Sequence, residues 1–180
     1  MASALLVIDV QEGLFRPEPR PALADAIVMR INDLTSRARE HDIPVCFVQH
    51  ETNSGELEFG SAAWALVKQL KVEATDNLVR KTTGDAFLRT SLSALLETLS
   101  VSHLFVCGYA TEFCVDTTVR RAAALGYDVT LVADAHTTHD KAHASAAQIR
   151  EHHNYTLPEI TSFGSRILAL SSDRLNFPSN

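Results

Sequence analysis

The sequence lacks several features that define common functional classes. It has only three cysteines in 180 residues and no CxxC pair, so no disulfide framework is indicated and a reducing compartment fits best. It has no cluster of Lys and Arg, and its net charge is −6, which disfavours nucleic acid as a partner. Neither GxGxxG nor GxxxxGK followed by Ser or Thr occurs, which disfavours a dinucleotide site or a phosphate loop.

Long hydrophobic runs are also missing. The chain starts without a basic segment, and its first apolar run is too short for a signal peptide or a membrane span. We therefore predict a cytoplasmic protein that has no membrane partner. Hydrophobic residues make up 46% and charged residues 21%, values that are ordinary for a globular protein. At 180 residues, we expect one domain over residues 1–180.

Short apolar runs alternate with segments of helical periodicity along the chain. Strands are predicted at 4–10, 44–49, 77–81, 103–108, 128–133 and 159–162. Helices are predicted at 22–41, 61–70, 88–99, 115–125, 141–153 and 164–170. This alternation predicts an α/β fold of three αβα layers, with a mainly parallel, Rossmann-like sheet of six strands and helices on both of its faces.

Three chemically capable residues follow predicted strands. Asp9 and Lys81 end two of them, and Cys114 follows a third at a predicted helix start. Strand ends of an open parallel sheet share one edge, so the three can converge on one crevice. A thiol at a helix N-terminus is expected to ionise more easily than a free one. Alternatively, Asp9 caps a loop and Lys81 is a solvated surface charge.

The remaining cysteines and most histidines suggest no further site. Cys46 and Cys107 lie within predicted strands, so we expect both to be buried and inert. Five histidines occur late in the chain without a regular metal-binding spacing, and we expect them to be solvated. They are His136, His139, His143, His152 and His153.

Several segments together resemble the isochorismatase-like cysteine hydrolase superfamily, over nearly the whole chain. They are Leu6-Val-Ile-Asp-Val-Gln11, Lys81 with Asp85-Ala-Phe87, Cys107-Gly-Tyr-Ala-Thr-Glu-Phe-Cys-Val115, Thr118-Val-Arg-Arg-Ala122, Leu125-Gly-Tyr127 and Asp134-Ala135. The resemblance implies a six-stranded parallel sheet and a catalytic triad of Asp9, Lys81 and Cys114. It also implies a cis peptide at Tyr109–Ala110, and an oxyanion hole made by the N–H groups of Ala110 and Cys114.

Departures from the family pattern narrow the expected chemistry. Nicotinamidases of the family bind a metal through an Asp-x-His motif, but this chain has Gln49 where the Asp would stand, so we predict no metal and no cofactor. Glu112 also stands where many members have Asp. Because true isochorismatases cleave a vinyl ether and lack the cysteine nucleophile, Cys114 indicates hydrolysis of an amide or ureide C–N bond through a thioester.

The resemblance also suggests what surrounds the triad. We expect a small amide-like substrate, a homo-oligomer, and pocket walls drawn from five side chains near the strand ends. These are Gln11, Phe15, Trp64, Tyr109 and Phe113. Two alternatives remain open at this stage: an isochorismatase-type vinyl ether hydrolase in which Cys114 is a bystander, and a non-catalytic binding protein that keeps a thiol.

Overall fold

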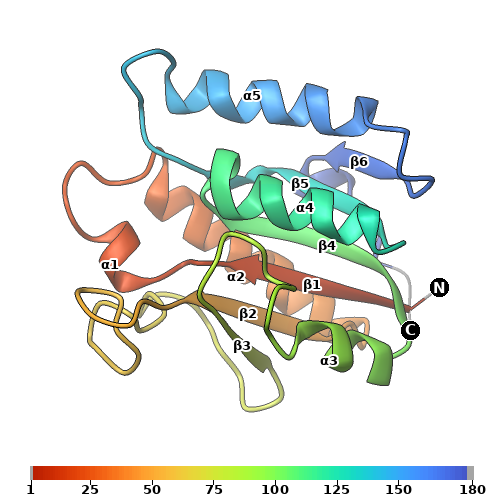
Figure 1. Cartoon of the computed structure of the whole chain (residues 1–180), viewed down its shortest axis with the longest axis horizontal. Helices are drawn as coiled ribbons and strands as arrows, with labels where there is room; N and C mark the ends of the chain where they lie inside the picture. Colours follow the sequence, from red (N-terminus) through yellow and green to blue (C-terminus); the bar gives the residue numbers. More distant parts are fainter. Residues whose placement is uncertain (1, 178–180) are drawn as a thin grey trace.

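The computed structural model describes residues 2–177 and contains one six-stranded sheet in which every strand pairing is parallel. The strands are β1 (Ala2–Ile8), β2 (Val45–His50), β3 (Asn77–Lys81), β4 (Val101–Tyr109), β5 (Asp128–Thr137) and β6 (Ile167–Leu170). Their order across the sheet is β3-β2-β1-β4-β5-β6, so the chain winds outward in both directions from the central pair β1 and β4 (Figure 1). Such a sheet has its crevice at the carboxyl ends of the strands.

Helices cover both faces of the sheet, which confirms the predicted three-layer α/β fold (Figure 1). Alternate β1 side chains point to opposite faces: Leu5 and Val7 pack with α2 (Ala24–Glu40), whereas Leu6 and Ile8 pack with the other face. That second face is covered by α3 (Leu92–Thr98) and α4 (Asp116–Ala124), with α5 (Ala146–Thr156) beside α4. The remaining helical segments are short: α1 (Glu12–Phe15), a π-helical turn (Thr111–Val115) and two 3-10 turns (Leu157–Glu159 and Ser172–Arg174).

Three predicted elements are wrong. The sixth strand is not at 159–162 but at Ile167–Leu170, inside the segment expected to be a helix, where it pairs with β5 from Val129↔Ile167 onward. Residues 61–70 form turns rather than a helix. This segment is tied down by the N–H of Val67, which donates to the carbonyl of Val10 at 3.1 Å. β5 also runs four residues past the predicted strand, to Thr137.

Gly108, the residue before the last one of β4, lies where no side chain fits. Its φ is +116°, and a Cβ built there would lie 2.1 Å from the carbonyl oxygen of Ile8, its partner in β1. Only glycine fits this close approach of two backbones. The turn that carries Cys114 begins three residues later, so the close pairing at Gly108 brings this part of the chain against the end of β1.

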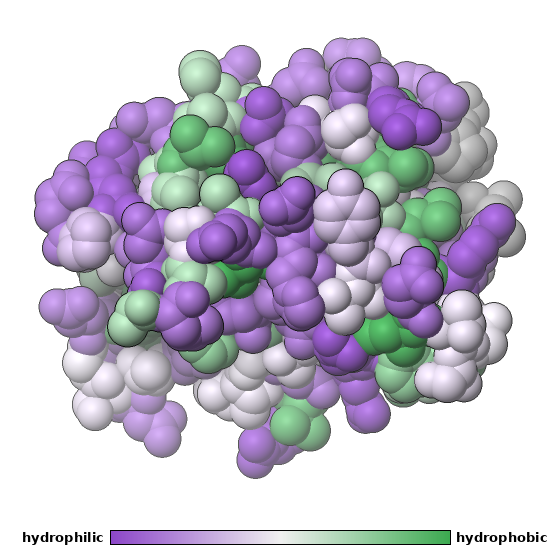
Figure 2. Space-filling view, turned by 90° about the horizontal axis from the view of Figure 1, so that it is seen from above, coloured by the Kyte–Doolittle hydropathy of each residue, from purple (hydrophilic) through white to green (hydrophobic). Residues whose placement is uncertain are grey.

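The face of the molecule seen from above is mainly hydrophilic (Figure 2). Figure 2 shows one face on which hydrophobic residues occur in separate small groups among polar ones. No helix among the described residues is both long and apolar enough to cross a membrane. Scattered exposed hydrophobic residues of this kind are normal for a globular surface.

Candidate active site

The structure brings Asp9, Lys81 and Cys114 together at the carboxyl edge of the sheet. Asp9 directly follows β1 and has a left-handed backbone (φ 51°), a conformation that Asp tolerates better than most residues. Lys81 is the last residue of β3, two strands away. Cys114 lies within the π-helical turn that joins β4 to α4. The strand-end argument therefore places all three correctly, while their catalytic roles stay predictions.

Lys81 contacts both other members of this group. Its Nζ lies 2.7 Å from Asp9 Oδ2 and 3.3 Å from Cys114 Sγ, and its side chain is 0% exposed. It also donates to the carbonyl oxygen of Thr83 at 3.1 Å. A buried ammonium needs such compensation, because an unpaired charge in the interior is very costly. The alternative of a solvated surface lysine is wrong.

Only one of the two carboxylate oxygens of Asp9 is engaged by a described residue. Oδ2 is engaged by Lys81, but Oδ1 is buried and accepts no hydrogen bond from any described residue. The carboxylate, Cys114 Sγ and a ring nitrogen of His50 all lie within 4.8 Å of one another. An unengaged carboxylate oxygen beside a thiol is a suitable acceptor for the thiol proton.

The Cys114 thiol is harder to ionise than its position at a helix start suggested. Burial and the negative charge of Asp9 raise the pKa of Cys114 to about 12, against the lowering effect of Lys81. The expectation of an easily ionised thiol is therefore wrong for the resting site. At neutral pH the resting site therefore holds Cys114 mainly as the thiol.

His50, at the end of β2, is a member of the site that the sequence analysis missed. Its Nδ1 lies 3.1 Å from Lys81 Nζ. Burial and then the Lys81 ammonium lower the pKa of His50, against smaller opposing effects of Asp9, the Thr83 carbonyl and Glu51. The imidazole is therefore neutral near pH 7, and Nδ1 accepts an N–H from Lys81. Its place at a strand end, like those of Asp9 and Lys81, is the signal that could have identified it.

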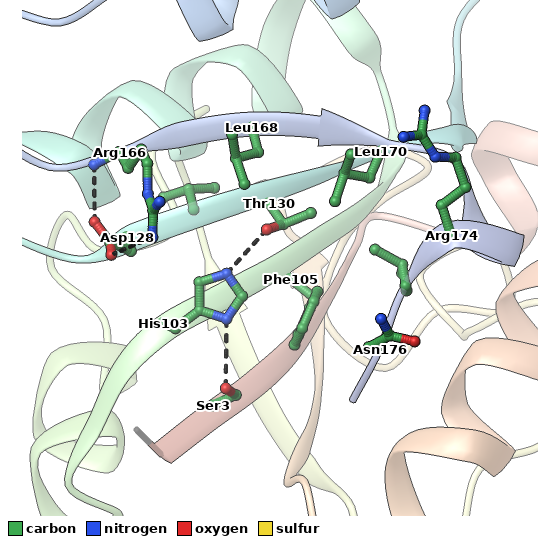
Figure 3. Close-up of a pocket in the computed structure, with 12 residues that line it drawn as sticks. Ser3, His103, Phe105, Asp128, Thr130, Arg166, Leu168, Leu170, Arg174 and Asn176 are labelled. Carbon is green, nitrogen blue, oxygen red and sulfur yellow. Dashed lines mark hydrogen bonds and ion pairs between the residues drawn. The ribbon is translucent and has the colours of Figure 1, made fainter. Parts of the chain in front are cut away.

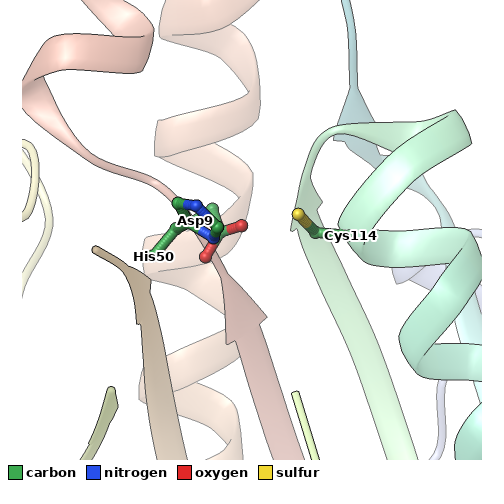
Figure 4. A group of neighbouring side chains, drawn as sticks. All are labelled: Asp9, His50 and Cys114. Carbon is green, nitrogen blue, oxygen red and sulfur yellow. The ribbon is translucent and has the colours of Figure 1, made fainter. Parts of the chain in front are cut away.

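Asp9, His50 and Cys114 also form a set of donors that a metal ion could use. Figure 4 shows Asp9 and His50 side by side at the ends of their strands, with the Cys114 sulfur pointing toward them. The Lys81 ammonium, however, contacts all three residues at 2.7, 3.1 and 3.3 Å, so a cation already occupies the space between them. A metal would have to displace a buried positive charge that is paired with Asp9.

The turn between β4 and α4 orients Cys114. The Tyr109–Ala110 peptide is cis, as the family resemblance implied. The carbonyl of Ala110 accepts hydrogen bonds from the N–H groups of Phe113 (3.0 Å) and Val115 (3.1 Å). These bonds close the turn that holds the backbone of Cys114 beside Ala110.

A buried hydrogen-bond chain fixes the start of this turn. Asn154 donates its amide N–H to the carbonyl of Ala133, so its Oδ1 faces His136 Nε2 at 2.9 Å. His136 Nδ1 must then accept from the Thr111 hydroxyl, at 2.8 Å. His136 is 0% exposed, and burial lowers its pKa to about 4. The prediction that this histidine is solvated is wrong, although His143 and His152 are exposed.

Removing the Thr111 hydroxyl tests this chain. In Thr111→Val the buried Nδ1 of His136 loses its donor, so we expect the free energy of unfolding to fall by about 1–3 kcal/mol. Thr111→Ser keeps the hydroxyl and serves as the matched control. Urea denaturation of both variants measures the difference, and an equal loss in the two would contradict the proposed bond.

The five predicted pocket residues have different surroundings. Gln11 is fully buried, and its amide bonds to the backbone of His50 and Trp64. Phe15 is buried and packs edge-on against Tyr109, with ring centroids 5.7 Å apart. Trp64 packs edge-on against an exposed Phe59, and its Nε1 is buried without a described acceptor. Their role as pocket walls stays a prediction.

Phe113 lies on the side of the turn that faces α5. It is 57% exposed and lines a cavity of about 640 Å³ with Lys141, whose Nζ is 5.3 Å from its ring centroid. Glu112 shares this cavity and bonds to the segment that follows β5, through Lys141 (3.2 Å) and the hydroxyl of Thr138 (2.9 Å). Glu112 therefore links the nucleophile turn to the segment before α5.

Another cavity, of about 350 Å³, lies away from this site. It includes residues at the starts of β1 and β5, and Figure 3 shows the His103 ring between the hydroxyls of Ser3 and Thr130. Burial lowers the pKa of His103. No cysteine is among the described residues that line this cavity, so it lacks the thiol found at the strand-end site.

The fold and the site define a parallel α/β protein with a buried Asp–Lys pair beside a cysteine. A model of the isochorismatase domain matches residues 3–162, and the chain belongs to this isochorismatase family. The crystal structure of an isochorismatase family protein superimposes with a TM-score of 0.86 and 38% identity, covering 94% of this chain and 98% of that one.

Relatives of known name include hydrolases. A streptothricin hydrolase of Streptomyces noursei is 36% identical over 138 residues, which cover 76% of this chain but only 50% of that protein. Nicotinamidase 3 of Arabidopsis thaliana is 31% identical over 151 residues, covering 76% of this chain and 73% of that protein. The relatives thus extend beyond nicotinamidases, and this chain spans about half the length of the streptothricin hydrolase.

Proposed function

We propose that the protein is a hydrolase that cleaves a C–N bond of a small amide or ureide through a thioester on Cys114. The observation that carries this proposal is the contact of Lys81 Nζ with both Asp9 Oδ2 (2.7 Å) and Cys114 Sγ (3.3 Å). An acid, a fixed cation and a thiol in one buried site are the groups that such a reaction needs. The names of the streptothricin hydrolase and the nicotinamidase support hydrolytic chemistry.

The first half of the reaction breaks the C–N bond. Asp9 Oδ1 takes the thiol proton, and the Cys114 sulfur bonds to the substrate carbonyl carbon. The resulting oxyanion accepts hydrogen bonds from the N–H groups of Ala110 and Cys114. As the carbonyl re-forms, the C–N bond breaks, and the protonated Asp9 gives its proton to the departing nitrogen. Lys81 keeps its positive charge throughout. It stabilises the negative charge on Asp9 before the proton transfer and on the Cys114 sulfur after it.

The second half releases the acid. Asp9 takes a proton from water, and the hydroxide oxygen bonds to the thioester carbon. The C–S bond then breaks, and the sulfur recovers the proton from Asp9. The same Asp9 oxygen serves both halves, which suits an oxygen that accepts no hydrogen bond from the residues that the structure describes.

An amide panel tests the proposal. The wild type is expected to release ammonia or an amine from at least one small amide or ureide, and Cys114→Ala to lose about 10³-fold or more in kcat/KM. Rapid quenching followed by intact-mass measurement should show an acyl adduct on the wild type. Cleavage of a vinyl ether substrate without an adduct, or equal amide turnover by both proteins, would contradict the proposal.

A further inference from the structure

The Lys81 ammonium has more acceptor atoms around it than it has N–H bonds to donate. A lysine ammonium has three N–H bonds, yet four acceptor atoms lie within 3.3 Å of Nζ: Asp9 Oδ2, His50 Nδ1, the Thr83 carbonyl oxygen and Cys114 Sγ. A thiol sulfur is the weakest of these acceptors. While Cys114 is protonated, the three N–H bonds therefore go to the carboxylate, the imidazole and the carbonyl.

Ionisation of Cys114 reverses this preference. A thiolate is a charged acceptor, and hydrogen bonds to charged groups are about twice as strong as neutral ones. One N–H must then turn toward sulfur. Asp9 Oδ2 has the shortest contact, and the Thr83 carbonyl belongs to the backbone two residues after Lys81. His50 is neutral and only partly buried, so it is the acceptor that can release an N–H most easily.

Two hydrogen bonds with Gln11 hold the backbone of His50 in place. Gln11 Oε1 accepts the His50 N–H at 2.8 Å, and Gln11 Nε2 donates to the His50 carbonyl at 2.9 Å. The buried Gln11 thus clamps the end of β2 to the segment after β1, beside Asp9. This clamp fixes where the imidazole starts, and it gives Gln11 a function that a pocket wall would not require.

We propose that His50 is a positioning residue that holds one Lys81 N–H away from Cys114 while the thiol is protonated and yields it when the thiolate forms. This role rests on the proposed function only in its use of the thiolate as nucleophile. Without His50, the spare N–H points at sulfur permanently and stabilises the thiolate. Loss of this one acceptor is thus expected to increase the reactivity of Cys114 toward an alkylating agent.

Alkylation of Cys114 measures this directly and needs no substrate. Iodoacetamide labelling is followed by mass spectrometry across pH, with Cys114→Ala as the blank; Cys46 and Cys107 are 0% exposed. His50→Ala is expected to label about tenfold faster than the wild type at neutral pH, equivalent to a pKa lower by about one unit. His50→Asn is the matched control, because its Oδ1 is attached to Cγ as Nδ1 is, and it should label at the wild-type rate.

The outcomes separate this inference from the proposed function. Unchanged or slower labelling of His50→Ala, or equal acceleration in His50→Asn, would overturn the positioning role, whatever the amide panel finds. A purely structural role would lower the melting temperature without moving the pH dependence of labelling. Should His50→Ala fail to fold, His50→Gln replaces it; its acceptor lies one bond too far, so it should also label faster than His50→Asn.

Discussion

Asp9→Asn is expected to make Cys114 more reactive toward iodoacetamide while nearly abolishing turnover. The Asp9 charge helps to raise the pKa of the thiol to about 12. Removing that charge leaves Lys81 as the main electrostatic influence, so the pKa of Cys114 falls and more thiolate is present at neutral pH. Turnover is nevertheless lost, since an amide cannot accept the thiol proton or return one to the departing nitrogen. We expect kcat/KM to fall by about 10³-fold or more.

This prediction is specific because the labelling rate is expected to rise while kcat/KM falls. A variant that merely distorts the site would lower both the labelling rate and kcat/KM. The pH dependence of labelling gives the sign: the midpoint should move to lower pH in Asp9→Asn than in the wild type. Slower labelling than wild type would show that Asp9 assists ionisation in the resting enzyme rather than only during turnover. Asp9→Glu, which keeps a carboxylate, is the control.

Much of the site follows from the positions of strand ends in the sequence. Asp9 and Lys81 end apolar runs that could only be buried strands, and parallel strands bring their carboxyl ends to one edge. The same rule applies to His50, which ends β2. Gln49 removes the metal motif at this place, so position at a strand end is the one signal that points to His50. The space between Asp9, His50 and Cys114, in which a metal ion could bind, is occupied by the Lys81 ammonium.

Other features depend on contacts that no local pattern encodes. The four-residue run of β6 is too short for periodicity to separate strand from helix, and pairing with β5 decides its state. Trp64 lies in a segment with helical spacing, but that segment is fastened as turns by Gln11 and Gln49, whose amides bond to the Trp64 carbonyl. The pKa of Cys114 likewise depends on burial and on Asp9, neither of which is visible at a helix start.

Lys81→Met is expected to cost more stability than any surface substitution in this protein. Methionine has nearly the shape of lysine but leaves the Asp9 carboxylate, only 2% exposed, without its cation. Removing one partner of a buried ion pair typically destabilises a protein by about 3–5 kcal/mol. Urea denaturation near neutral pH measures this loss. A loss near zero would mean that Lys81 and Asp9 are not a stabilising pair.

A double variant separates the lost charge from the lost packing. In Asp9→Asn with Lys81→Met no charge of the pair remains, so we expect much of the stability lost in Lys81→Met to return, although neither protein should turn over an amide. The pH dependence supplies a second check. A lone buried carboxylate takes up a proton more readily than one in the unfolded chain, so the deficit of Lys81→Met should shrink as the pH falls. In the double variant that dependence should disappear, because the carboxylate responsible for it is gone; its persistence would place the titrating group elsewhere.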